Sequence, residues 1–85
     1  MATKALVECQ IAAVKQLDDH KSDATTIGRA VASFCVRESQ ALFSTITRGQ
    51  SEGRIRALRE RWAVDQVQSG TNIVLSMRAQ SQKSL

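Results

Sequence analysis

The sequence predicts an all-α fold, a small helical hairpin or bundle with three main helices and a short C-terminal helix. The 85 residues include no proline and only four glycines, the two residue types that most disfavour helix. Alanine, leucine, arginine, glutamine and glutamate, which favour helix, are abundant. Apolar residues also recur with the helical period of about 3.6 residues. At this length we expect a single helical domain over residues 1–85.

The first helix is expected over residues 2–19. Counted at about 100° per residue, its apolar side chains form one stripe: Ala2, Leu6, Cys9, Ala13 and Leu17. The polar segment DDHKSD then interrupts the pattern. Ser22 or Asp23 can cap the helix that follows, because their side chains accept hydrogen bonds from unpaired N–H groups.

The second helix is expected over residues 24–48. One broad apolar face supports it, made by Ile27, Ala30, Val31, Phe34, Cys35, Ala41, Leu42 and Ile46. Gly49 suits the left-handed position after a helix end, and Arg48 suits the negative end of the helix dipole. We therefore expect the helix to end at the segment RGQS.

A third helix is expected over residues 52–68, capped by Ser51. Ile55, Leu58 and Trp62 form its apolar stripe, which then loses phase. The valines Val64, Val67 and Val74 point to other sides and leave a second apolar surface unaccounted for.

The segment SGTN follows the loss of phase. Gly70 can end the third helix there, and Thr71 or Asn72 can cap a fourth helix over residues 72–80. Residues 73–77 are also compatible with a strand. Helix is favoured, because a single strand in a helical chain would have no partner.

The net charge of +4 is unevenly distributed. Residues 1–47 carry five basic and five acidic side chains, whereas residues 48–85 carry seven basic and three acidic ones. This asymmetry is compatible with an anionic partner. No signal peptide or membrane-spanning segment is expected, and two cysteines are too few for a disulfide framework. We therefore expect a cytoplasmic location, or a place within an intracellularly assembled complex.

No catalytic, cofactor or metal site is predicted. His20 lies beside Asp18 and Asp19 in a segment that is more typical of a solvated turn than of a set of converging metal ligands. Cys9 and Cys35 lie on apolar stripes and are interpreted as small core residues. Their sulfurs could approach if the first two helices pack antiparallel, which the sequence leaves open. We expect neither an enzyme nor a small-molecule substrate, because no catalytic motif is present.

Glu38 falls near the centre of the second helix's apolar face, between Phe34 and Leu42. A buried carboxylate must reach water, take a proton or meet a cation. Arg54, Arg59 and Arg61 are the natural candidates for that cation. Glu38 then lies either at a wet edge of the bundle or at a position that fixes helix pairing, and both interpretations stay open.

Five arginines and the only tryptophan occur within residues 48–62. On a helical wheel Arg54 and Arg61 flank the apolar stripe on one side and Arg59 flanks it on the other. Glu52, Glu60 and Asp65 can pair with some of the cations. Tryptophan rimmed by arginine is typical of protein-interaction sites. The predicted interaction residues are Ile55, Leu58, Trp62, Arg54, Arg59, Arg61 and Glu38.

The sequence thus favours a non-enzymatic protein-interaction or assembly component. Such a protein would be a homo-oligomer, or a small structural or adaptor subunit of a larger complex such as a virus particle or a bacterial assembly. The alternative is a basic helical protein that binds nucleic acid through the segment Arg48–Arg61. Its possible contacts are Arg48, Arg54, Arg59 and Lys83. Whether Trp62 packs inside its own bundle or inside a partner stays open.

Overall fold

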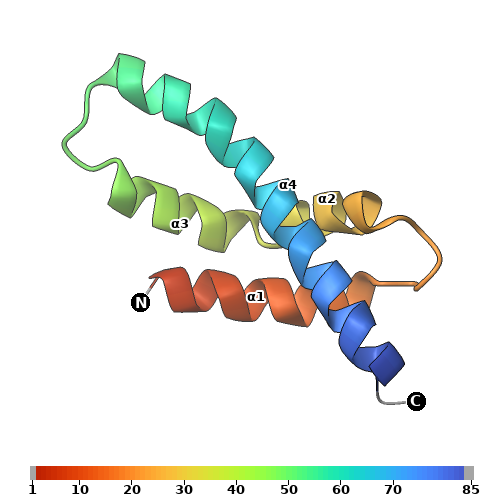
Figure 1. Ribbon diagram of the computed structural model, residues 1–85. Helices are drawn as coiled ribbons and strands as arrows, with labels where there is room; N and C mark the ends of the chain where they lie inside the picture. The colour runs from red at the N-terminus through yellow and green to blue at the C-terminus, as the bar shows by residue number, and fades with distance from the viewer. Residues whose placement is uncertain (1, 84–85) are drawn as a thin grey trace.

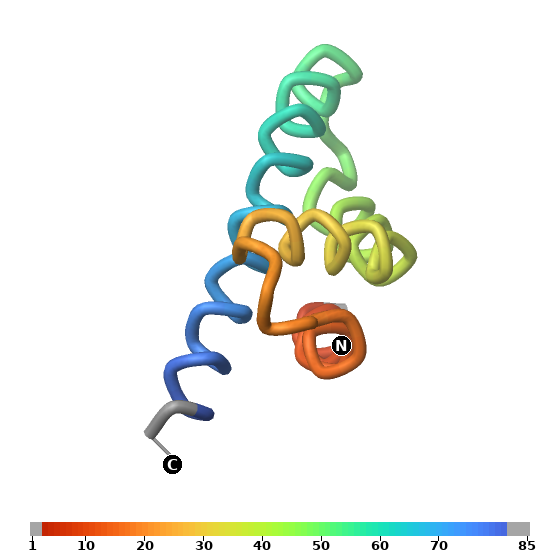
Figure 2. Tube along the Cα trace, turned by 90° about the vertical axis from the view of Figure 1, so that its right-hand side faces the viewer, coloured from red at the N-terminus to blue at the C-terminus, as the bar shows by residue number. Residues whose placement is uncertain are grey.

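The computed structural model describes residues 2–83, and the side chains of residues 3–81. It has four helices: α1 (Ala2–Leu17), α2 (Ala24–Phe34), α3 (Val36–Ile46) and α4 (Glu52–Lys83). The predicted all-α class is confirmed, and residues 73–77 are helical. Helix α4 runs diagonally across α2 (Figure 1). The view in Figure 2 looks along α1 and shows α2 passing against the middle of α4. The molecule is elongated, with extents of 50 × 24 × 17 Å.

The predicted second helix, over residues 24–48, is wrong as one element, because it is divided into α2 and α3 at Cys35. At this Cys35 bend the backbone leaves the helical region, with φ of −102° and ψ of 25°. Neither glycine nor proline marks the position. The bend rotates the inward face, so that Ser39 and Phe43 are buried while Ala41 and Ile46 are exposed.

The predicted break at SGTN is also wrong, because α4 runs without interruption from Glu52 to Lys83. The reason lies in a close crossing of α4 over α2. A Cβ atom at Gly28 would lie 2.8 Å from the amide nitrogen of Thr71 and 2.9 Å from the carbonyl oxygen of Val67. A Cβ atom at Gly70 would lie 2.9 Å from the carbonyl oxygen of Gly28. The glycines therefore permit helix contact rather than ending a helix.

The core lies where α1, α2 and α4 meet. Its buried apolar residues are Leu6, Ala13, Val14, Ile27, Val31, Cys35 and Val74. Val74 is fully buried, so the prediction that it belongs to a surplus surface is wrong. The unbroken α4 carries Val74 past the Gly28–Gly70 crossing and into contact with the core.

The predicted caps and turn residues at the helix ends agree with the structure better than the predicted helix lengths do. Asp23 caps α2 by accepting a hydrogen bond from the amide of Thr26 at 2.8 Å. Gly49 has a φ of +83°, and the hydroxyl of Ser51 accepts a bond from the amide of Arg54 at 3.3 Å. Helix α1 ends at Leu17, two residues earlier than predicted. The Ser51 cap and the left-handed Gly49 are therefore confirmed.

The turn between α1 and α2 is held by two aspartates. Asp19 accepts hydrogen bonds from the amides of Lys21 and Ser22, which lower its pKa to about 2. Asp18 forms an ion pair with Arg78 of α4, with 2.6 Å between Arg78 Nη2 and Asp18 Oδ1 and 3.1 Å between Nε and Oδ2. These hydrogen bonds lower the pKa of Asp18 against the opposing effect of burial.

Candidate functional site

An apolar hollow lies between α4 and the α2–α3 segment. We call it the α4 groove; it has a volume of about 470 Å³. Its lining includes the apolar residues Val36, Phe43, Trp62 and Val67 and two arginines, Arg29 and Arg59. No aspartate or glutamate is among its lining residues. A second hollow of about 350 Å³ shares Arg29, Ala63 and Val67 with it and extends it along α2.

Trp62 belongs both to the fold and to the α4 groove. Its Nε1 donates a hydrogen bond to the hydroxyl of Ser39 at 2.7 Å, and its ring centroid lies 5.5 Å from that of Phe43. The rings are tilted by 53°, an arrangement typical of favourable aromatic pairs. The guanidinium of Arg59 lies 5.8 Å from the centre of the Phe43 ring. Trp62 is therefore partly buried in its own chain, and it also lines the groove.

The other residues of the predicted interaction site are only partly brought together. Ile55 and Leu58 are half-buried along α4, while Arg54 and Arg61 are exposed and do not line the groove. Arg29 of α2 does line it, and sequence reasoning missed this residue. The sequence indicates little about this position of Arg29. The residue is distant in sequence from the arginine-rich segment, and it meets that segment only through the crossing of α2 and α4.

The predicted ion pairs within α4 do not form. Within the described part of the chain, lysine and arginine form ion pairs only in Lys4–Glu8 and Arg78–Asp18. The arginines of the segment RIRALRER are therefore not neutralised as expected. Their side chains extend into solvent along different sides of α4, apart from Arg59 at the groove.

The residues predicted to contact nucleic acid lie in different parts of the structure. Arg48 follows α3, and Arg54 lies in the first turns of α4, and both are exposed. Lys83 is the last residue of α4, and its side chain lies outside the described residues. At about 1.5 Å per residue, the helix places it roughly 44 Å from Arg54. These residues do not form one compact patch.

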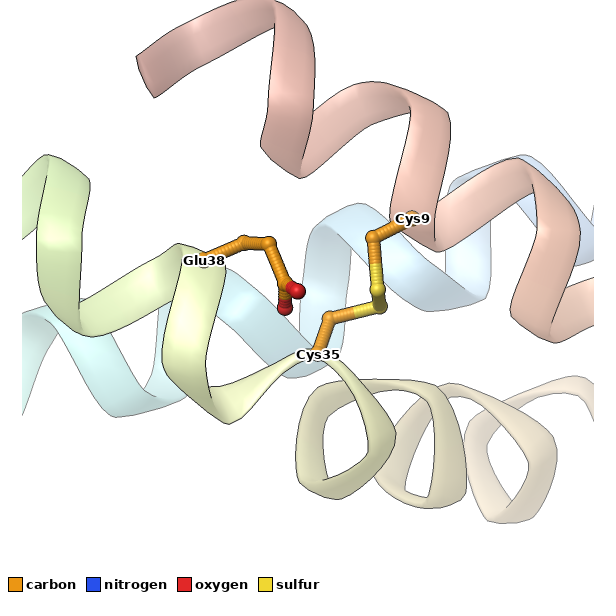
Figure 3. Close-up of side chains that lie close together, drawn as sticks. All are labelled: Cys9, Cys35 and Glu38. Carbon is orange, nitrogen blue, oxygen red and sulfur yellow. A yellow bond between two sulfur atoms is a disulfide. The ribbon is translucent and has the colours of Figure 1, made fainter.

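Cys9 and Cys35 form a disulfide that joins α1 to the Cys35 bend, with their Cα atoms 5.9 Å apart (Figure 3). Both cysteines belong to the core, as predicted, and their sulfurs meet, which the sequence left open. The sequence pattern that could have indicated the disulfide is the position of each cysteine on the inward stripe of its helix. That pattern alone does not specify which residues of the two stripes meet, because helix order and register are set by packing of the whole chain.

Glu38 points toward this disulfide from the first turn of α3 (Figure 3). Among the described residues no arginine pairs with it, contrary to expectation. Its Oε2 atom is buried and has no hydrogen-bond partner. The two sulfurs and a carboxylate oxygen of Glu38 all lie within 4.8 Å of one another. We call these three residues the Cys–Glu cluster.

Comparisons with known proteins were made at three levels. No protein-family model, no curated protein and no solved structure matches the chain. Of the helices in residues 2–83, none is both long enough and apolar enough to cross a membrane.

Proposed function

We propose that the chain is a non-enzymatic interaction protein whose α4 groove binds an amphipathic helix of a partner protein. The partner helix would insert apolar side chains between α4 and α2–α3 and place acidic side chains against the arginines at the rim. The observation that carries the proposal is an apolar groove whose only charged lining residues are two arginines. Helices commonly bind proteins in such grooves through apolar anchors spaced three or four residues apart.

The apolar side chains around the groove support this proposal. Val36 is 46% exposed and Val64, in the adjoining hollow, is 68% exposed. Burial of such surface stabilises a complex by about 25 cal/mol per Å² before the costs of association. Trp62 is already fixed by Ser39 and Phe43, so it would lose little freedom on binding. A pre-ordered aromatic side chain of this kind suits a binding hot spot.

The positive charge of the α4 groove and of the whole chain decides which kind of partner we propose for the groove. The rim offers Arg29 and Arg59, and the whole chain carries a net charge of +4. A second copy of the chain would bring the same positive charge, whereas an acidic helix would be attracted by it. We therefore propose a different protein as the partner, in a larger assembly, and treat self-association as an alternative outcome of the test.

The proposed place of action is the cytoplasm or an intracellularly assembled complex. Cytosolic thiol systems reduce most disulfides, and oxidising compartments preserve them. Neither Cys9 nor Cys35 lines the α4 groove. We therefore expect the interaction to take place whether or not the disulfide is formed, provided that the helices stay folded.

The test uses a fluorescent helical peptide with leucines on one face and glutamates beside them. Its binding is measured by fluorescence anisotropy against a peptide in which lysines replace the glutamates. We expect the acidic peptide alone to bind, and Arg59→Glu to weaken its affinity at least about tenfold through charge reversal at the rim. Arg56→Glu is the matched control, because Arg56 lies exposed on α4 outside the groove.

Three outcomes would contradict the proposal. The first is equal loss of affinity in both variants, which would indicate a general charge effect. The second is tighter binding of duplex DNA than of either peptide, with the steep salt dependence of phosphate contacts, which would favour the nucleic-acid alternative. The third is a stable oligomer in light scattering whose formation Arg59→Glu abolishes. Thermal unfolding of each variant checks that the fold is retained.

A further inference from the structure

The Cys–Glu cluster brings together three potential metal ligands from two parts of the chain. Cys9 comes from α1, while Cys35 and Glu38 lie three residues apart at the start of α3. Side chains spaced by three residues lie on the same side of a helix. Their donor atoms all lie within 4.8 Å of one another. Thiolate sulfur and carboxylate oxygen are both established zinc ligands.

The position of Glu38 is costly in the disulfide form. A buried carboxylate oxygen without a hydrogen-bond partner loses its hydration and gains nothing in return. The N-terminus of α3 gives partial compensation, because its unpaired amides carry partial positive charge near Cys35 and Glu38. A cation held between the carboxylate and the two sulfurs would satisfy the oxygen completely.

We propose that the reduced chain binds one Zn²⁺ through the sulfurs of Cys9 and Cys35 and the carboxylate of Glu38. Water fills the fourth position of a tetrahedral site, since Cys9 and Glu38 are only half-buried. The same two cysteines then hold α1 against the Cys35 bend in two alternative ways. One is the disulfide, and the other is the metal.

The conversion of the disulfide form to the zinc form conserves atoms and electrons. A dithiol reductant supplies two electrons and two protons and becomes a disulfide itself. The bond between Cys9 Sγ and Cys35 Sγ breaks, and both residues become thiols. Zn²⁺ then displaces the two thiol protons, which pass to solvent, because the thiolate is the metal ligand.

Binding of zinc would change the distances between the ligand atoms of the Cys–Glu cluster. Zn–S bonds of about 2.3 Å and Zn–O bonds of about 2.1 Å separate tetrahedral ligands by roughly 3.5–4 Å. The sulfurs must therefore move apart once their bond is broken, and the carboxylate must move slightly inward. Zinc is favoured over Mg²⁺ or Ca²⁺ because two of the three ligands are sulfur.

The test titrates the full chain with Co²⁺, as a spectroscopic substitute, and then with Zn²⁺. The chain is reduced with a dithiol that is removed before the metal is added. We expect one equivalent of Co²⁺ to produce a sulfur-to-cobalt charge-transfer band and one equivalent of Zn²⁺ to abolish it. The oxidised chain is a folded control that should show no band, because its sulfurs are bonded to each other.

Glu38→Gln separates a three-ligand site from simple binding to two thiols. We expect this variant to bind Zn²⁺ at least about tenfold more weakly than the reduced parent chain. Glu60→Gln is the matched control, since Glu60 is exposed on α4 and remote from the cluster. Equal affinity of Glu38→Gln and the parent chain would overturn the proposal, as would absence of the cobalt band in the reduced chain.

Unfolding on reduction would not prevent the test. Circular dichroism would then follow helix content as Zn²⁺ is added to the reduced chain, because metal binding contributes directly to folding. Recovery of helix in the parent chain and in Glu60→Gln, with less recovery in Glu38→Gln, supports the site. No recovery in the parent chain overturns it.

Discussion

Asp18 and Arg78 show how two residues 60 positions apart fix the relation between helices. The carboxylate of Asp18 is only 4% exposed, and Arg78 also donates to the carbonyl oxygen of Ser22 at 2.8 Å. Arg78 therefore ties the C-terminal part of α4 to the turn between α1 and α2. Sequence reasoning placed Asp18 in a solvated turn and did not detect this pair, because no local pattern indicates a contact between residues 60 positions apart.

Replacement of Arg78 tests this pair. We expect Arg78→Met to lower the melting temperature at pH 7 by roughly 5–10 °C, a large shift for a domain of this size. The cause is a buried Asp18 carboxylate left without its cation. Arg56→Met, at an exposed position without an ion pair, is the control and should change the melting temperature by about 1–2 °C at most.

The ion pair between Asp18 and Arg78 also predicts how the stability of the chain changes with pH. The folded-state pKa of Asp18 is lowered, so its stabilising effect is complete above its unfolded pKa of about 4 and is lost as the pH falls through the folded pKa. The difference in stability between the parent chain and Arg78→Met should therefore shrink as the pH is lowered from 7 to 3. A constant difference, measured by urea unfolding at both values, would contradict the assignment.

At the scale of elements, the Gly28–Gly70 crossing determines how α2 and α4 pack. A methyl group at Gly28 would meet backbone atoms of α4, which cannot move aside as a flexible side chain can. The α2–α4 contact is the most extensive between any two elements of the structure. Separation of these helices would therefore loosen the packing around Val31 and Val74, both fully buried.

Gly28→Ala is the corresponding prediction. Overpacking costs about 1–3 kcal/mol, and the gain in helix propensity of about 1 kcal/mol offsets part of it. We expect a net loss of up to about 2 kcal/mol in the free energy of unfolding, measured by urea denaturation. Gly53→Ala is the control, because a Cβ atom at this position of α4 meets nothing within 4 Å. It should stabilise the chain by about 0.5 kcal/mol.

The elements also show which features the sequence determines locally. The ends at Asp23, Gly49 and Ser51 follow from short-range hydrogen bonds and backbone preferences, and these were predicted. The Cys35 bend and the unbroken course of α4 depend on contacts with distant residues. Gly70 is compatible with a helix end and with a helix crossing, and only the position of Gly28 in space distinguishes the two.

At the scale of the whole molecule, the disulfide closes the chain around α2. It connects residues separated by 26 positions and therefore restricts the unfolded chain. We expect reduction in the presence of a metal chelator to lower the free energy of unfolding by about 3 kcal/mol. The measurement is urea unfolding with and without a dithiol. A loss below about 1 kcal/mol would mean that packing alone holds α1 in place.

The functional surfaces were predictable in part at this scale. Sequence reasoning selected Trp62 and Arg59, because an aromatic residue flanked by arginines is recognisable within one helix. It also singled out Glu38 as a carboxylate on an apolar face. It could not place Arg29 beside Arg59, or Cys9 beside Glu38, because these meetings depend on helix crossings that no local pattern encodes.

The Cys9–Cys35 bond also determines how the molecule would respond to tension applied at its two ends. Force would run from the N-terminal turns of α1 through the sulfur bridge into α3, and it would bypass the residues between the two cysteines. Those residues, 10–34, include all of α2 and cannot extend while the bond is intact. At about 3.5 Å per residue, roughly 90 Å of chain is thereby withheld from stretching. Opening the bridge would release that length, so redox state would set the reach of the polypeptide under load.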